Sequence, residues 1–549
     1  MSRLKYYIKW QARSIHPLIF VVISVAVIFA LHNVTFWTIW ADSFKGAEIR
    51  GVIFAVALLL LCCGLVSIFA MKRILQPFIA FLFILSSITS YYMDQLGVII
   101  DREMIQNVVT TTLMEGKHLV TRSFLIWVGV SGVVPSIVVF YFKIDHPKFF
   151  YSVLQNIAFL VLCILGTVLL VATDIKGNSS VLRLRIDLKS SFQPLAPITE
   201  SVLYLAMITR SATLEFQKIG SDATLISNFK KQEKPILTVV VVGETARSQS
   251  FSLGNYSRPT NPKLENEDIV YYDNVSSCGT STAVSLPCMF SKFERSNYSY
   301  EKGTSQENVL DVIQRAGYHV EWIDNNTGDK GLAARAKYTQ VTYANDPKFC
   351  GEGECLDGIL VKEVAKRLPD IKNNTLLVLH QIGSHGPSYY LRYPRALEKF
   401  KPACQTSNFF DCTKEEIINA YDNSIAYTDK VTADLIALLK KQKHINTSMI
   451  YISDHGESLG ENGLYLHGAP YFMAPKEQTM VPMIVWLSDT YQGLTGIKPE
   501  CLKANSMQGY SHANLFHSLL GMAGVRTVEY KPSLDIFNPC GNKANVKED

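Results

Sequence analysis

Five long apolar segments in the first third of the chain most constrain how it can fold. They cover residues 17–31, 51–71, 77–93, 124–142 and 149–172. A helix needs about 20 mostly apolar residues to cross the hydrocarbon core of a membrane, and four of the segments reach or approach that length. The first is shorter, but the aromatic residues Phe36, Trp37 and Trp40 can extend it to the membrane interface. The sequence therefore predicts a transmembrane domain of five helices over residues 1–172.

The short loops between these segments predict the direction in which the chain crosses the membrane. Short cytoplasmic loops are enriched in lysine and arginine. Basic residues gather before the first segment, after the second and after the fourth: Arg3, Lys5, Lys9, Arg13, Lys72, Arg73, Lys143 and Lys148. An odd number of spans then gives a cytoplasmic N-terminus and places everything after residue 172 on the other side. The alternative for the first segment is a cleaved signal peptide, but no small-residue cleavage site follows it.

The eleven cysteines divide between the apolar first third of the chain and the polar remainder. Three lie inside the apolar segments, where a thiol behaves as a small hydrophobic group. The other eight lie in the polar part of the chain: Cys278, Cys288, Cys350, Cys355, Cys404, Cys412, Cys501 and Cys540. An even number in close pairs indicates disulfides formed in an oxidising compartment, and no CxxC motif supports the alternative of zinc-binding thiols. Pairing of successive cysteines is the simplest pattern, although eight cysteines permit about 105 pairings.

The rest of the chain divides into a connector and a soluble domain. Residues 173–234 mix apolar and basic side chains, which indicates amphipathic helices at a membrane surface or, for the second half, a plain linker. Over residues 235–549, short β-branched runs alternate with helical patterns. This alternation predicts an α/β domain with a mainly parallel sheet covered on both faces. The formal charge of +5 is modest and no aromatic-interleaved basic patch occurs, so we expect no nucleic-acid partner.

Residue types that bind metals follow three of the predicted strands. They are, in chain order, Glu244, His385, Asp454, His455 and His467. In sheets of this kind functional groups gather at the carboxyl ends of the strands. Carboxylates and imidazoles suit a zinc ion that keeps one coordination position open. Each of these residues alone is more often structural, but their combination at strand ends predicts a metal site.

A nucleophile for this site is expected in the segment Ser-Cys-Gly-Thr-Ser-Thr-Ala at residues 277–283. Thr280 lies just before a short helical pattern, where oriented N–H groups favour an anionic phosphate and a developing alkoxide. Coordination to a metal would lower the pKa of its hydroxyl. The alternative is that Thr280 only caps the helix. Ser281 and Thr282 are neighbouring hydroxyls, and spacing alone does not rank the three.

Taken together, these motifs resemble the lipid A phosphoethanolamine transferases of the alkaline phosphatase superfamily, including the mobile colistin-resistance enzymes. The matching pieces are Val-Val-Gly-Glu-Thr-Ala-Arg, Cys-Gly-Thr-Ser-Thr, Asp-Asn-Asn, Gly-Ser-His-Gly-Pro, Ser-Asp-His-Gly-Glu-Ser-Leu-Gly-Glu and Leu-His-Gly. With the five spans ahead of them, the similarity covers nearly the whole chain. It implies a sulfatase-like catalytic domain in the periplasm, anchored in a bacterial inner membrane. We expect a monomer in the lipid bilayer.

The resemblance also implies roles for individual residues. Zn²⁺ would be held by four of them: Glu244, Thr280, Asp454 and His455. Thr280 would carry the phosphoethanolamine group. His385 and His467 would bind a second zinc ion or the substrate phosphate, and one of them would protonate a leaving oxygen. Contacts to the substrate are implied for Asn326, Lys330, Asn107, Thr111 and Glu115.

The implied reaction has two halves. Thr280 attacks phosphatidylethanolamine and releases diacylglycerol, and a phosphate of lipid A then takes the phosphoethanolamine from the threonine. The added amine reduces the negative charge of the lipopolysaccharide surface, which implies resistance to polymyxin. The alternatives are a transferase with a heptose or glycan acceptor, a glycerophosphate transferase of the lipoteichoic acid synthase type, and a membrane sensor that has lost catalysis. A sulfatase activity is disfavoured because the Cys/Ser-x-Pro-x-Arg signature is absent around Thr280.

Overall fold

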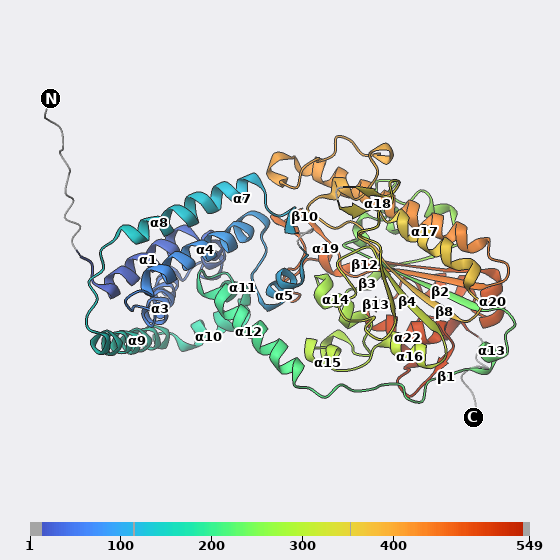
Figure 1. The fold of residues 1–549 in the computed structure, drawn as a ribbon, viewed down its shortest axis with the longest axis horizontal. Coiled ribbons are helices and arrows are strands. Elements are labelled where there is room, and N and C mark those ends of the chain that lie inside the picture. The colour runs from blue at the N-terminus through green and yellow to red at the C-terminus, as the bar shows by residue number, and fades with distance from the viewer. Residues whose placement is uncertain (1–13, 113–115, 352, 542–549) are drawn as a thin grey trace. The chain divides into compact units, whose positions relative to one another are not determined.

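The chain groups into two compact units in a computed structural model that describes residues 14–112, 116–351 and 353–541 (Figure 1). The first unit comprises Met1–Arg102 and Val120–Val202, and the second comprises Glu103–Leu119 and Leu203–Asp549. The short segment Glu103–Leu119 therefore belongs to the second unit, although it lies between two predicted spans. Five residues of the predictions above lie outside the described residues: Arg3, Lys5, Lys9, Arg13 and Glu115.

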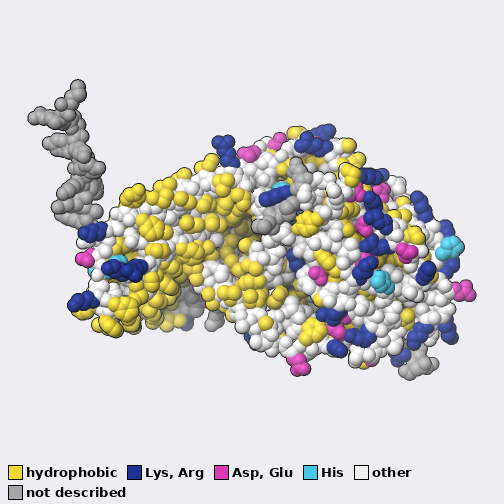
Figure 2. All heavy atoms as spheres, viewed as in Figure 1, with side chains coloured by type: hydrophobic (Ala, Val, Ile, Leu, Met, Phe, Trp, Pro, Cys, Tyr) yellow, Lys and Arg dark blue, Asp and Glu magenta, His cyan; other side chains and the backbone are white. Residues whose placement is uncertain are grey.

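The first unit is helical. Its helices are α1 (Pro17–Leu31), α2 (Val34–Ser43), α3 (Glu48–Ser67), α4 (Leu75–Leu96), α7 (Arg122–Trp127), a π-helical turn (Val128–Val133), α8 (Val134–Tyr141), α9 (Phe149–Ala172), α10 (Ile175–Leu184) and α11 (Ile186–Ser190). Helix α12 (Leu195–Ala212) continues from this unit into the second. Large apolar side chains cover the surface of these helices, as Figure 2 shows. Such a surface belongs to a protein that sits in a membrane.

The predicted five spans are only partly matched. Among the described residues four helical stretches are long and apolar enough to cross a membrane: Glu48–Ser67, Leu75–Leu96, Arg122–Tyr141 and Phe149–Ala172. A fifth is reached only if α1 and α2 count as one span, and these two helices meet at a bend of 76°. The 15 residues of α1 extend for only about 22 Å. The aromatic residues expected to prolong the first span lie beyond the bend, on α2.

The second unit is built on a sheet of eight strands in the order β13-β3-β12-β9-β2-β8-β4-β5. The strands are β2 (Ile236–Gly243), β3 (Val270–Ser276), β4 (His319–Asp324), β5 (Lys337–Gln340), β8 (Thr375–His380), β9 (Asn446–Ser453), β12 (Met480–Leu487) and β13 (Tyr510–Ser511). The sheet is mixed: β12 runs antiparallel to both of its neighbours, and the other pairings in this sheet are parallel. The prediction of a mainly parallel sheet missed this reversal.

The reversal of β12 follows from the connection that precedes it. After β9 the chain forms the hairpin of β10 (Ser458–Glu461) and β11 (Leu464–Leu466) and the short helix α19 (Lys476–Thr479). No long helix carries the chain back across the sheet, so β12 starts at the edge where β9 ended. A strand that begins where its neighbour ends must run antiparallel to it.

Helices cover both faces of the sheet, as expected for strands that are apolar along their whole length. Every residue of β2 and of β9 is buried. Figure 1 shows α17 (Gly358–Arg367) and α18 (Lys414–Lys440) on one side of the sheet, with α16 (Val309–Arg315) and α22 (Ala513–Met522) on the other. The four disulfides join successive cysteines, in the predicted order: Cys278–Cys288, Cys350–Cys355, Cys404–Cys412 and Cys501–Cys540.

Candidate active site

The site forms where two central parallel strands end side by side. Strands β2 and β9 are paired up to Gly243 and Ser453, so the residues that follow them, Glu244 and Asp454, leave the sheet at the same edge. The amide of Asp454 donates to the carbonyl of Gly243 at 2.9 Å, which holds the two strand ends together. Glu244, Asp454 and the next residue, His455, are all completely buried. Strand pairing thus sets the spacing of the cluster.

Glu244, Asp454 and His455 form a group that could hold a metal ion. One ligand atom from each lies within 4.8 Å of the other two. The Nε2 of His455 is 3.4 Å from a carboxylate oxygen of both Glu244 and Asp454. The Nδ1 of His455 lies 2.9 Å from the carbonyl of Gly456, which can only accept, so Nδ1 carries a proton and Nε2 is the nitrogen that faces the cluster.

The cluster fits a cation on two further grounds. The Oδ1 of Asp454 accepts from two backbone amides, but its buried Oδ2 has no hydrogen-bond partner within the described part of the chain. Burial, together with the neighbouring Glu244 carboxylate, raises the pKa of Asp454. Burial lowers the pKa of His455, but the two carboxylates outweigh it and raise that pKa overall. Excess negative charge and an unsatisfied buried oxygen are the features that a bound metal ion would satisfy.

The hydroxyl that lies against this cluster is that of Thr282, not that of Thr280. The Oγ1 of Thr282 is 3.0 Å from Oε2 of Glu244 and 3.4 Å from Nε2 of His455. The hydroxyl of Thr280 instead donates to the carbonyl of Ala469 at 2.7 Å. The expectation that Thr280 contacts the metal ligands is therefore corrected to Thr282.

The start of a helix explains this difference between the two threonines. Ser281 is extended and serves as the N-cap, and Thr282 is the first residue of α14 (Thr282–Met289). A side chain at that position lies beside the unpaired amides of the first helical turn, where an anionic phosphate is favoured. Spacing in the sequence could not rank the three hydroxyls of the Thr-Ser-Thr run. The start of α14 distinguishes them, because it determines which side chain lies at the first helical position.

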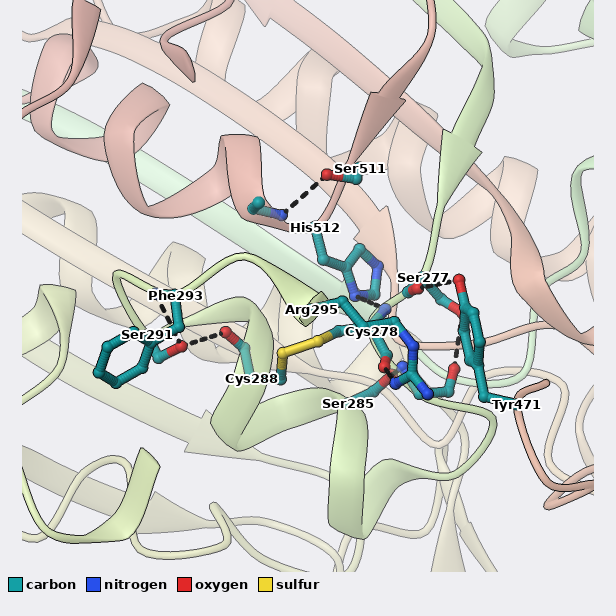
Figure 3. The surroundings of a disulfide bond; sticks show 12 residues. Ser277, Cys278, Ser285, Cys288, Ser291, Phe293, Arg295, Tyr471, Ser511 and His512 are labelled. Atoms are coloured by element: carbon teal, nitrogen blue, oxygen red, sulfur yellow. Dashed lines mark hydrogen bonds between the residues drawn. A yellow bond between two sulfur atoms is a disulfide. The ribbon is translucent and has the colours of Figure 1, made fainter. Parts of the chain in front are cut away.

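A disulfide and a buried histidine fix this helix relative to the strand end (Figure 3). Cys278 precedes α14 and is bonded to Cys288 within it. The ring of His512 accepts from the amide of Cys278 at 3.0 Å, and it donates to the carbonyl of Ser453 at 2.9 Å. Burial lowers the pKa of His512 to about 4, so its ring is neutral and can play both parts. Sequence reasoning missed His512 because a single histidine after a two-residue strand carries no signal.

His385 and His467 both lie near the cluster, as the sequence predicts. The ring of His467 is 4.4 Å from the ring of His455 and 5.5 Å from that of His385, measured between centroids. The Nδ1 of His467 lies 2.9 Å from a carboxylate oxygen of the buried Glu457, which also accepts from the hydroxyl of Tyr389. A carboxylate behind an imidazole fixes the orientation of the ring. Glu457 and Tyr389 were not identified from the sequence.

Asn326 reaches the site, whereas Lys330 bonds within its own turn. The side-chain amide of Asn326 donates to Oε2 of Glu244 at 2.8 Å. The ammonium of Lys330 lies 3.0 Å from both the carbonyl and the hydroxyl of Thr327. Behind Asn326 lies a buried pair that sequence reasoning missed, in which Nδ1 of His380 is 2.9 Å from Asp324. Strand pairing alone could have suggested it, because Asp324 and His380 are direct partners on β4 and β8.

Two of the residues expected on the outer loop bond to each other. Asn107 lies on α5 (Arg102–Thr110), and its carbonyl accepts from the hydroxyl of Thr111 at 2.7 Å. Their neighbour Gln106 is 4% exposed and donates to the carbonyl of Ala283, one residue after Thr282. The loop thus contributes to the second unit beside α14, through a residue that was not predicted.

Known proteins share both the membrane part and the catalytic part of this chain. The family model described as sulfatase matches residues 237–525, and the model described as phosphoethanolamine transferase EptA/EptB matches residues 58–207. Phosphoethanolamine transferase EptA of Escherichia coli strain K12 is 40% identical over 468 residues, which cover 85% of each chain. Phosphatidylethanolamine transferase Mcr-1 of Escherichia coli is 34% identical, over 88% of this chain and 92% of that protein.

A solved structure extends the similarity to the fold of nearly the whole chain. It is the integral membrane protein lipooligosaccharide phosphoethanolamine transferase A of Neisseria meningitidis, with a TM-score of 0.91 and 32% identity. The match covers 95% of this chain and 98% of that one. A helical membrane unit, a sulfatase-like catalytic unit and a Glu-Asp-His cluster beside a threonine thus occur together in one chain. This chain belongs to the phosphoethanolamine transferase family of the alkaline phosphatase superfamily.

Proposed function

We propose that this protein transfers phosphoethanolamine from phosphatidylethanolamine to a phosphate group of lipid A, with Thr282 as the nucleophile. The donor is supported by the name of Mcr-1, a phosphatidylethanolamine transferase, and the acceptor class by the Neisseria protein, which acts on lipooligosaccharide. The observation that carries the nucleophile is the contact of the Thr282 hydroxyl with Glu244 and His455 at the start of α14.

Zn²⁺ is the cofactor that we propose, held by Glu244, Asp454, His455 and the oxygen of Thr282. Two carboxylates and one imidazole leave a coordination position for that oxygen, as in catalytic zinc sites. When bound, the ion lowers the pKa of the coordinated hydroxyl and stabilises charge on the transferred phosphoryl group. His385 and His467 bind the substrate phosphate or a second zinc ion.

The chain's own residues account for both halves of the reaction. The Thr282 hydroxyl donates toward Glu244, so a lone pair of Oγ1 remains to attack phosphorus. The new bond joins Oγ1 to phosphorus while the hydroxyl proton passes to Glu244, the bond from phosphorus to the diacylglycerol oxygen breaks, and that oxygen takes a proton from His385 or His467. In the second half an oxygen of the acceptor phosphate attacks the phosphothreonine and gives its proton to that histidine, and the threonine oxygen leaves and takes back the proton from Glu244. Asn326 and Lys330 bind the phosphoethanolamine group, and Asn107, Thr111 and Glu115 contact the ethanolamine of the donor or the substrate.

The cellular setting belongs to the same proposal. The protein is a monomer in a bacterial inner membrane, with a cytoplasmic N-terminus and a periplasmic catalytic domain at residues 235–549. Residues 1–172 form the membrane domain, and residues 173–234 connect the two. The amine added to lipid A lowers the negative charge of the outer surface, so cells that make the protein resist polymyxin.

Intact mass after incubation with phosphatidylethanolamine and Zn²⁺ tests the nucleophile and the donor together. We expect a phosphoethanolamine adduct on Thr282 in the full-length protein and in Thr280→Ala, but not in Thr282→Ala. Thr280→Ala is the matched control, since it removes a neighbouring hydroxyl that bonds to Ala469. An adduct that persists in Thr282→Ala would refute the nucleophile. A glycerophosphate adduct from phosphatidylglycerol would refute the donor.

A further inference from the structure

The segment Glu103–Leu119 contacts the rest of the catalytic unit at three places, two of them next to a proposed site residue. Gln106 donates to the carbonyl of Ala283, which follows the proposed nucleophile. Met104 packs so closely on Gly468, which follows His467, that a β-carbon there would lie 2.6 Å from its methyl group. At its other end, His118 lies 3.5 Å from the carboxylate of Glu354. Glu354 is in turn connected to His385 through Arg392.

Glu354 is held between two cationic or ionisable groups at the tip of a small disulfide hairpin. It belongs to β7 (Glu354–Cys355), which pairs with β6 (Cys350–Gly351) and is closed by the Cys350–Cys355 bond. One carboxylate oxygen faces His118, and the other accepts from the guanidinium of Arg392 at 2.9 Å. Burial opposes ionisation of Glu354, but the two partners lower its pKa to about 2, so it carries its charge.

Arg392 connects this carboxylate to the loop that carries His385. The arginine is 3% exposed, and its Nε donates to the carbonyl of His385 at 3.0 Å. A buried guanidinium with one hydrogen bond to a carboxylate and another to a carbonyl has a fixed position, because losing either bond would leave buried charge unpaired. The position of the His385 backbone is thereby tied to that of Glu354.

The other side of the same loop is fixed independently of Arg392. Asp357 accepts from the amides of Ile382 and Gly383, both at 2.9 Å. Gly383 has φ +51° and lies so close to Glu244 that a β-carbon would fall 2.5 Å from the carbonyl of Glu244. The loop is therefore anchored before His385 by Asp357, and Arg392 binds the carbonyl of His385 itself.

We infer that Glu354 and Arg392 are positioning residues that hold His385 in place for transfer, and that His118 ties this pair to the segment Glu103–Leu119. None of the three needs to touch the substrate, because each acts through the next and finally through the backbone of His385. The inference rests on the proposed role of His385. It adds a route by which a loop between two membrane spans affects the geometry of the catalytic site.

Transfer rates of the full-length protein in lipid nanodiscs that contain phosphatidylethanolamine test the inference. We expect Arg392→Gln to lower kcat by about 10-fold or more with a smaller change in KM, because misplaced catalytic groups reduce turnover. The kcat of Arg392→Lys should lie between those of Arg392→Gln and the wild type, since a lysine keeps the charge but not the forked geometry. Glu354→Gln should resemble Arg392→Gln, and His118→Ala should have a smaller effect of about threefold.

A matched control and a double variant separate positioning from simple stability. Arg335→Gln breaks another arginine–carboxylate ion pair, with Asp311, far from His385 in the sequence; its arginine is more exposed, and the variant should lower the apparent Tm with kcat unchanged. In a His385→Ala background Arg392→Gln should change the rate less than twofold, because residues that act as one unit are not additive. If Arg392→Gln lowers the rate as much in the His385→Ala background as in the wild type, or if its kcat equals that of Arg335→Gln, this inference is overturned. The proposed role of His385 would still stand in that case. A normal rate in His385→Ala would overturn the role of His385 and this inference with it.

Discussion

A single buried oxygen, Oδ2 of Asp454, is the strongest indication that the site binds a cation. It is enclosed by Glu244 and His455 and lacks a hydrogen-bond partner in the described part of the chain, although its sister oxygen accepts two amides. An unsatisfied buried carboxylate oxygen costs about 1–3 kcal/mol or more. A cation shared with Glu244 and His455 removes this cost and offsets the repulsion between the two carboxylates.

Metal removal should therefore destabilise the protein as well as inactivate it. We expect a chelator to lower the apparent Tm of the wild-type protein by several degrees, because a ligand that binds only the folded state stabilises it. Asp454→Asn removes the repulsion and weakens the metal site, so its apparent Tm should respond little to the chelator. The measurement is thermal unfolding with and without chelator, alongside metal content by mass spectrometry. An equal response in both proteins would contradict a metal at this cluster.

The residue scale also shows where prediction from sequence stops. Glu244, Asp454 and His455 were predictable because they lie within two residues of the ends of recognisable strands, and paired parallel strands end at the same edge of a sheet. Thr282 was not, because three hydroxyls in succession differ only in backbone conformation. The extended Ser281 ends the loop and turns the first helical side chain toward the metal ligands.

At the scale of elements, α14 is the part that must be held most accurately. Its N-terminal residue is the proposed nucleophile, and its only covalent anchor among the described residues is the Cys278–Cys288 bond. His512 adds a second anchor by bridging Cys278 to the end of β9. The helix and the strand end that provide the proposed nucleophile and two of the proposed metal ligands are thus connected through one buried imidazole.

Removing different disulfides should separate anchoring of α14 from general stability. We expect Cys278→Ser with Cys288→Ser to lower transfer by about 10- to 100-fold, because the nucleophile loses its fixed position. Cys404→Ser with Cys412→Ser opens a loop of similar length, at a sequence separation of 8 compared with 10, and should mainly lower the apparent Tm. Transfer assays at a temperature well below both midpoints make the comparison. Equal losses of activity would show that α14 needs no special anchor.

A pH-dependent ion pair joins β4 to α17. Burial raises the pKa of Glu321, but Arg367, Thr339 and Lys337 together lower it to about 2 from an ordinary value near 4.5. A lowered pKa in the folded state means that the stabilisation is complete above about pH 4.5 and disappears as the pH falls toward 2. Near neutral pH the contribution is on the order of 1–3 kcal/mol.

Replacing Glu321 should therefore lower the stability of the protein at neutral pH but not in acid. We expect Glu321→Gln to lower the apparent Tm at pH 7, with the gap to the wild type closing between about pH 4.5 and pH 2. Paired melting curves of the two proteins across that range measure the gap directly. Glu363→Gln, which removes a more exposed partner of Arg367, provides the comparison and should have a smaller effect at pH 7. A gap that is constant with pH would contradict ionisation of Glu321 as the cause.

The elements themselves were predictable to different degrees. The strands and long helices follow from runs of β-branched residues and from helical periodicity. The direction of β12 could not be predicted, because it depends on a connection that returns to the same edge of the sheet rather than crossing it. The bend between α1 and α2 was missed for a similar reason, since hydropathy records length and not direction.

At the scale of the whole molecule, the division into units does not follow the order of the chain. The segment Glu103–Leu119 belongs by sequence to the membrane part and by contacts to the catalytic unit. No periodicity reveals this, because the contacts are made by single side chains such as Gln106 and His118. Fragments that begin after the membrane helices therefore lack part of the catalytic unit.

A fragment of residues 203–549 should keep the metal and lose activity. All proposed metal ligands lie within it, so we expect the same metal content per chain as in the full-length protein. Without Gln106 beside Ala283 and His118 beside Glu354, transfer from a soluble short-chain donor should be reduced by about 10-fold or more. Metal analysis and single-turnover assays of both proteins make the test. A fragment without metal would place a determinant of the metal site in the part of the chain before residue 203.

The order of the cysteines has a consequence for how the protein is made. Each disulfide joins a cysteine to the next one along the polar part of the chain, at separations of 10, 5, 8 and 39 residues. A chain that enters an oxidising compartment from its N-terminal side therefore exposes each cysteine first to its native partner. Oxidation in the order of synthesis yields the native set without any bond having to be broken again. In such a compartment we expect the native set to form with an oxidase alone, whereas crossed pairs would also need an isomerase.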